Sequence, residues 1–104
     1  MTRPANPLRG EASLTLGGIE LVLRPSFEAL VAAEAELGSL FAMVDRAAQG
    51  AMGIGEMAAL LWHCLPPEGR PSRDAVGEAV LTMGMIEAAR PLRTILTQII
   101  KGRG

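Results

Sequence analysis

The chain has 104 residues, of which 49% are apolar and only 3% aromatic, so we expect one domain with a core of aliphatic side chains. Its formal net charge of −1 gives no global reason to expect nucleic acid or an anionic membrane as a partner. The single cysteine, Cys64, excludes an internal disulfide. No secretory signal and no apolar run of about 18 residues is evident, so a cytoplasmic protein without a membrane span is expected.

A β-hairpin is predicted over residues 11–24, after an extended lead-in over residues 1–10. Apolar and polar residues alternate in 11–16 and again in 19–24, a period of two that is typical of half-buried strands. The Gly17-Gly18 link favours a tight turn, because such turns need positive φ angles that glycine adopts easily. The resulting register makes Glu11 and Arg24 an exposed pair of opposite charges. The apolar pairs that it places on the other face are Ala12 with Leu23, Leu14 with Leu21, and Leu16 with Ile19.

The first helix is predicted over residues 27–37, with Ser26 as its N-cap and Gly38 just past its end. Glu34 falls in the middle of its apolar stripe, at 100° per residue. Because buried carboxylates are usually paired, Glu34 is expected to be satisfied by Arg9, by Arg24 or by backbone donors. The alternative is a contact that Glu34 offers to a partner. The apolar stripe around it consists of Phe27, Leu30, Val31 and Leu37.

Four more helices are predicted after the first. Ser39 caps a helix over residues 40–49, and a connector with three glycines, 50–55, leads to an almost wholly apolar helix over 56–65. After a proline-rich loop, Ser72 caps a helix that ends before Gly84. The last helix, 85–101, is clearly amphipathic, and Pro91 should kink it or begin a new helix. Its apolar stripe is formed by Met85, Ala88, Ala89, Leu92, Ile95, Leu96, Ile99 and Ile100.

These elements predict a single α+β domain over residues 1–104 that is mostly helical. A lone two-stranded hairpin is only marginally stable in water, so it must pack on something. We therefore expect the N-terminal β-hairpin to pack on four to five α-helices of the region 26–101.

No arrangement of residues that would support catalysis is evident. His63 and Cys64 are neighbours on a helix and point about 100° apart, so they cannot form a nucleophile–base pair. One cysteine and one histidine are two ligands short of a zinc site. The glycines of 50–55 lack the lysine and hydroxyl of a phosphate-binding loop. We therefore expect a protein that is not an enzyme and has no cofactor and no metal, with His63 and Cys64 in structural roles.

Two features of the sequence point to partner binding. Methionines near the helix junctions either fill the core or line an adaptable groove for a partner. Acidic residues prevail from 26 to 56, whereas residues from 90 onward carry four bases and no acid, so copies of the chain could dock head to tail as a homo-oligomer. The candidate partner-binding residues are Glu34, Met52, Met57, Trp62, Met83, Met85, Leu92, Ile95 and Ile99.

Several short motifs together resemble those of a known family. They begin with Asn6 and Arg9-Gly10-Glu11 at the start of the first strand, and continue through the Gly17-Gly18 turn to Leu23-Arg24. The remaining ones are Ala29-Leu30, Glu34 and Gly38 in the first helix, a leucine-rich helix ending near Leu65, and Gly84 before the last helix. Across nearly the whole chain, the sequence resembles the small tail tube or tail assembly proteins of phages and alphaproteobacterial gene transfer agents.

The resemblance implies a tail assembly chaperone, which coats the tape-measure protein, recruits tail tube subunits and is absent from the finished particle. The alternative that the resemblance leaves open is a structural tail tube subunit. One hairpin supplies little sheet for a ring built by joining strands, which favours the chaperone. A third hypothesis is a small DNA-binding regulator that uses the basic last helix, but no helix-turn-helix spacing is evident.

Overall fold

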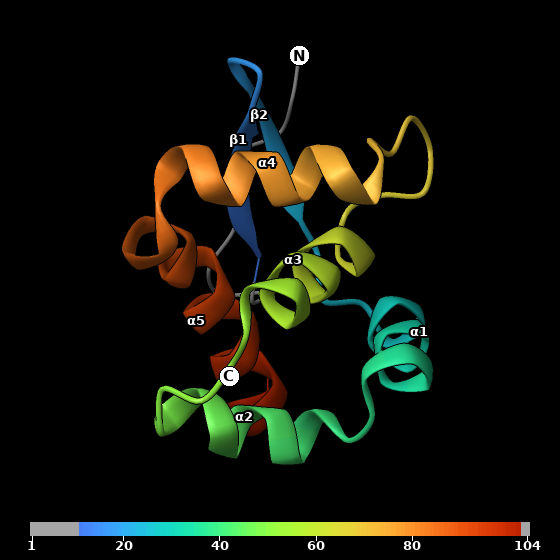
Figure 1. The fold of residues 1–104 in the computed structure, drawn as a ribbon. Coiled ribbons are helices and arrows are strands. Elements are labelled where there is room, and N and C mark those ends of the chain that lie inside the picture. Colours follow the sequence, from blue (N-terminus) through green and yellow to red (C-terminus); the bar gives the residue numbers. More distant parts are fainter. Residues whose placement is uncertain (1–10, 103–104) are drawn as a thin grey trace.

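The hairpin and the helices follow one another along the chain much as their sequence patterns predict (Figure 1). The computed structural model describes residues 11–102, so the predicted lead-in over residues 1–10 lies outside the described part. The architecture is α+β, with one antiparallel hairpin followed by helices, which confirms the predicted fold class. The elements are β1 (Ala12–Leu16), β2 (Ile19–Leu23), α1 (Phe27–Leu37), α2 (Leu40–Ala48), α3 (Ile54–His63), α4 (Arg73–Met83) and α5 (Met85–Lys101).

The hairpin has the predicted register, from Leu16 opposite Ile19 at the turn to Ala12 opposite Leu23 at the open end. Gly17 and Gly18 have φ angles of 59° and 80°, as the tight turn requires. The predicted facing of the side chains is wrong at two positions of β2. Ile19 is exposed because the turn projects beyond α4 (Figure 1), whereas Val22 is buried close to the open end of the hairpin.

The open end of the hairpin is fastened to the helices. The backbone N–H of Arg24 donates to the carbonyl of Cys64 at 2.8 Å, which ties the end of β2 to the end of α3. The predicted pair of Glu11 and Arg24 forms at 3.2 Å, but Glu11 is buried rather than exposed. The base of the hairpin is therefore part of the packed interior on both of its faces.

Serine side chains begin three of the helices where the sequence predicts them. The hydroxyls of Ser26, Ser39 and Ser72 each accept a hydrogen bond from the backbone N–H three residues later. Helix α3 begins at Ile54, two residues before its predicted start, because the N–H of Gly53 donates to a carboxylate oxygen of Glu56 at 3.1 Å. The glycine connector is correspondingly shorter than predicted.

Helix α3 is the centre of the core and packs against α1, α4 and α5. Helix α5 also packs against β1 and α2, and it continues as one helix through Pro91, so a new helix does not begin there. The burial of one face of α5 against several elements offsets the hydrogen bond that proline removes. The largest fully buried side chains are Leu14, Leu23, Met43, Leu60, Leu61, Ile95, Val76 and Val80.

Helix α1 turns a different face to the core from the one predicted. Phe27 is 84% exposed and Val31 is 49% exposed, although both were expected to face inward. Ala33 is fully buried instead, with Leu30 and Leu37 packed partly against the core. A small side chain at the contact lets α1 lie close to α3, so the two larger residues are turned outward.

Candidate partner-binding groove

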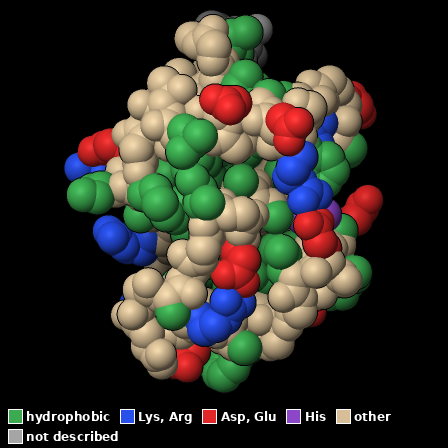
Figure 2. Space-filling model, viewed as in Figure 1, with side chains coloured by type: hydrophobic (Ala, Val, Ile, Leu, Met, Phe, Trp, Pro, Cys, Tyr) green, Lys and Arg blue, Asp and Glu red, His purple; other side chains and the backbone are tan. Residues whose placement is uncertain are grey.

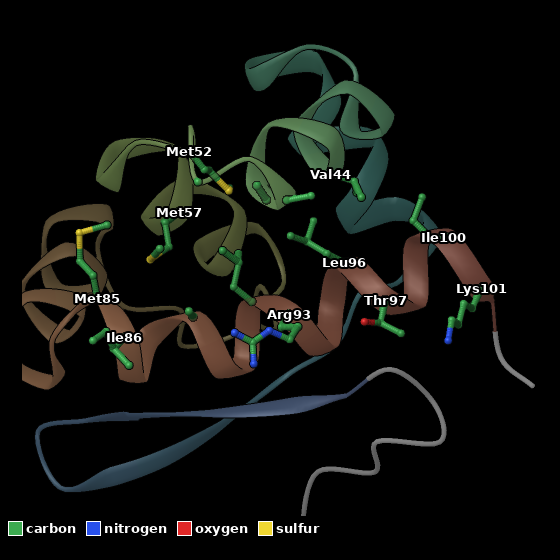
Figure 3. A pocket seen from close by; sticks show the side chains of 15 residues that line it. Val44, Met52, Met57, Met85, Ile86, Arg93, Leu96, Thr97, Ile100 and Lys101 are labelled. Carbon is green, nitrogen blue, oxygen red and sulfur yellow. The ribbon is translucent and has the colours of Figure 1, made fainter.

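An open apolar groove of about 600 Å³ lies between α2, α3 and α5. Met52 from the glycine connector, Met57 from α3 and Met85 from the start of α5 all line it, as Figure 3 shows. Leu92 and Leu96 contribute further apolar surface from α5. Thioether side chains are flexible and polarisable, so a groove lined by them adapts to differently shaped apolar partners.

The exposed ends of the groove come from α5. Ile86 is 85% exposed near one end and Ile100 is half exposed near the other, and both line the groove. At the helical rise of about 1.5 Å per residue, they are separated by roughly 21 Å along α5. In the space-filling view, apolar side chains gather on the left side of the molecule, where Figure 1 places the start of α5 (Figure 2).

The charged side chains that line the groove are cationic. Arg93 and Lys101 lie on α5, and among the lining residues that the structure describes none is acidic. Neither cation forms an ion pair with any residue from 11 to 102. The groove therefore combines an apolar floor with positive charge that nothing in the described chain neutralises.

An ion pair supports the wall of the groove opposite α5. Arg46 on α2 donates two hydrogen bonds to Glu56 on α3, at 2.8 and 2.6 Å. These bonds, together with the one from the N–H of Gly53, lower the pKa of the Glu56 carboxyl. Glu56 thus joins α2, the glycine connector and α3, and this connector carries Met52 into the groove.

The sequence model of one protein family, described as "phage tail tube protein, GTA-gp10", matches residues 9–102. The chain belongs to this family. It is therefore a phage or gene transfer agent tail protein, as the motifs of the hairpin and the first helix suggest. Searches among curated proteins and among solved structures found no match.

The groove of this tail protein contains some of the residues that the sequence singles out and not others. Met52, Met57, Met85 and Leu92 come together there. The remaining predicted residues lie elsewhere: Ile95 is fully buried in the core, Met83 and Ile99 pack partly against it, and Trp62 and Glu34 are at other sites. Among the groove residues that sequence reasoning does not single out for a partner are Ile86, Arg93, Thr97, Ile100 and Lys101. The amphipathic pattern of α5 does mark Ile100 as apolar, but nothing marks Ile86.

Trp62 belongs to a cluster that joins α3 to the loop before α4. Its indole N–H donates to the carbonyl of Pro71 at 2.9 Å. The guanidinium groups of Arg70 and Arg73 lie 4.3 and 4.4 Å from the centre of its ring, within the range of cation–π interactions. The indole is therefore engaged within the fold and is half-buried there.

Glu36 connects α1 to this cluster. Its carboxylate accepts two hydrogen bonds from Arg73, at 2.6 and 2.9 Å, and lies 2.8 Å from Nε2 of the buried His63. The bonds from Arg73 and then from His63 lower the pKa of the Glu36 carboxyl from 4.5 to about 2. Three helices meet at this one carboxylate.

Glu34 is exposed and does not lie in a buried stripe. Its carboxylate accepts a hydrogen bond from the backbone N–H of Leu40 at 3.0 Å, in the first turn of α2. Of the partners considered for it, the backbone donor is therefore confirmed. Arg24 bonds to Glu11 instead, and Arg9 lies outside the described residues.

Cys64 and His63 point into separate surroundings. Burial raises the pKa of the Cys64 thiol to about 12, whereas His63 contacts Glu36. Within residues 11–102, no group of three or more histidine, cysteine or acidic side chains could hold a metal ion. In the same range, no helix is both long enough and apolar enough to span a membrane.

Proposed function

We propose that this tail protein is a non-enzymatic tail assembly chaperone. Its groove holds an apolar helical segment of the tape-measure protein, and the bound complex recruits tail tube subunits. The observation that carries the proposal is the groove between α2, α3 and α5, with Met52, Met57 and Met85 on its walls.

The dimensions of the groove suit a helix as its occupant. The separation of Ile86 and Ile100, roughly 21 Å, corresponds to about four turns of a partner helix. An amphipathic helix binds such a groove through apolar residues spaced three and four apart, which form one stripe. Methionine-lined grooves tolerate varied side chains, and this tolerance suits a chaperone that captures several segments of a long protein.

A structural tail tube subunit is the second candidate, and the description of the family favours it. A subunit of this kind would join its strands to those of its neighbours around a ring. The sheet within residues 11–102 consists of β1 and β2, each five residues long. So small a sheet offers few backbone hydrogen-bonding groups for joining neighbours into a ring. The apolar groove, in contrast, offers a binding surface that suits the chaperone.

Co-expression with the tape-measure protein that is encoded beside this chain tests the proposal. We expect the two proteins to elute together in affinity capture followed by size-exclusion chromatography. Ile86→Ser should weaken capture, because Ile86 lines the groove and is too exposed to affect folding. Leu81→Ser is the matched control, since Leu81 is an exposed aliphatic residue on α4 that does not line the groove.

Two results would overturn the chaperone in favour of the tube subunit. The first is assembly of the purified protein alone into rings or tubes that the tape-measure protein cannot disperse. The second is its presence in purified particles in amounts comparable to those of a tube protein. Capture that Ile86→Ser and Leu81→Ser reduce equally would show that the groove is not the binding site.

A further inference from the structure

The outward face of α1 is apolar at its centre and acidic beside it. Phe27 and Val31 are four residues apart and therefore lie on the same side of the helix, 84% and 49% exposed. Glu28 is next to them, exposed, and has no ion pair or hydrogen bond from its carboxylate to any described residue. Together Phe27 and Val31 form an exposed apolar patch beside an acidic group, a combination suited to contact with another molecule.

The groove has the complementary properties. It is concave and apolar, and its cations, Arg93 and Lys101, are as unneutralised as Glu28 on α1. Within one copy the two surfaces cannot meet, because α1 is fixed to α3 and α2 by its buried face and no residue of α1 lines the groove. In Figure 1, α1 and the start of α5 lie on opposite sides of the molecule.

We infer that the groove of one copy receives the outward face of α1 from a second copy of this chain. Phe27 and Val31 enter the apolar floor, and Glu28 approaches Arg93 and Lys101 at the rim. This contact goes beyond the proposed function, because it needs neither the tape-measure protein nor a tube subunit. The two surfaces differ, so each copy can engage one neighbour through α1 and another through its groove, which builds a ring or a chain.

The other exposed aromatic residue on a helix fits the groove less well. Phe41 on α2 is followed four residues later by Asp45, whereas Phe27 is followed at the same spacing by the apolar Val31. Asp45 already accepts a hydrogen bond from Gln49 at 3.2 Å, and α2 is itself a wall of the groove. Phe41 therefore serves as the control position for Phe27.

Light scattering and sedimentation of the full chain over a range of concentrations test the inference. The wild type should exceed the mass of a monomer as concentration rises. Phe27→Asp on α1 and Ile86→Asp in the groove should each weaken self-association by about tenfold or more, because each introduces a charge at an apolar anchor. Phe41→Asp should associate like the wild type. Both target side chains are exposed, and circular dichroism verifies that the variants fold.

Mixing the two defective variants gives the sharpest test. Phe27→Asp keeps an intact groove and Ile86→Asp keeps an intact α1 face, so together they should form a 1:1 complex that stops at two copies. A wild-type protein that stays monomeric, a Phe27→Asp variant that associates normally, or a mixture that stays monomeric would each overturn the inference.

The same variants separate this inference from the chaperone proposal. Phe27→Asp should still capture the tape-measure protein, because Phe27 is not part of the groove. If Ile86→Asp loses capture while self-association is unaffected, the inference fails and the chaperone proposal stands. If self-association follows the expected pattern and no tape-measure protein is captured, the reverse holds.

Discussion

Replacing Glu36 by glutamine should destabilise the protein by about 1 kcal/mol at neutral pH. The pKa of Glu36 is lowered from 4.5 to about 2 by Arg73 and His63, and such a shift corresponds to an upper limit of about 3 kcal/mol. The side chain is 40% exposed, so solvent screens the interaction and reduces it to the range of well-formed surface ion pairs. For a domain of this size, a loss of about 1 kcal/mol lowers the melting temperature by roughly 4–8 °C.

The pH dependence of this loss follows from the direction of the shift. A carboxyl group whose pKa is lower in the folded protein contributes its full stabilisation above its unfolded value of 4.5. That contribution disappears as the pH falls from 4.5 toward 2. The difference in unfolding free energy between the wild type and Glu36→Gln should therefore be constant at neutral pH, decrease below pH 4.5 and vanish only below the folded pKa of about 2, where Glu36 becomes fully protonated.

Chemical unfolding followed by far-ultraviolet circular dichroism and by the fluorescence of Trp62 measures this difference. Trp62 reports on the site directly, because Arg73 lies over its ring and is held there by Glu36. Glu78→Gln is the control, since Glu78 is an exposed residue on α4 whose carboxylate makes no ion pair with a described residue. Equal stabilities of wild type and Glu36→Gln, or a difference that does not decrease between pH 4.5 and pH 2, would refute the reasoning.

Four further perturbations test other parts of the structure. Leu60→Ala should cost about 2–5 kcal/mol in chemical unfolding, because Leu60 is fully buried in α3; a loss below about 1 kcal/mol would contradict its place in the core. Cys64 should resist alkylation until the protein unfolds, since its thiol is buried, and rapid labelling of the native protein would count against this. Glu34→Ala should lower stability by about 0.5–1.5 kcal/mol through the lost bond to Leu40, whereas unchanged unfolding with lost partner binding would assign Glu34 to a partner. A tape-measure segment should dissociate the self-associated protein into smaller complexes, as both ligands need the groove, and growth of the existing assemblies would disagree.

Local chemistry explains the elements that the sequence predicts well. The Gly17-Gly18 turn and the alternation beside it define the hairpin register without help from distant residues. Serine caps do the same for helix starts, as at Ser39, because the hydroxyl bonds to a backbone group only three residues away. The start of α3 after Gly53 is predicted two residues too late, although that of α5 after Gly84 is correct.

Tertiary packing decides what local patterns leave open. Helix α1 is rich in apolar residues all round, so its periodicity fits more than one inward face. The structure selects the face with Ala33, because a small side chain permits close packing, and this leaves Phe27 outside. Glu36 meets His63 and Arg73 across 27 and 37 residues of sequence, a separation at which no short motif reports a contact.

The candidate groove illustrates the same limit. The methionines indicate an adaptable surface from composition alone, and three of the four that the sequence suggests for a groove do line it. The contribution of α5 depends on how this helix lies against α2 and α3. Ile86 and Arg93 therefore become recognisable as groove residues only in the folded chain.

Self-association through the groove bears on the choice between the chaperone and the tube subunit. A tube subunit that joined its neighbours through α1 and the groove would keep the groove filled in the finished particle. A chaperone must release the same groove to bind an apolar helix, so its self-association has to be weak enough for a partner to displace. Ile86 reports on this difference, because its side chain is exposed in the isolated chain. Reagents in solution should reach it only while the groove is empty. Protection of Ile86 that the tape-measure protein cannot reverse would therefore favour the tube, whereas exchange of one occupant for the other would favour the chaperone.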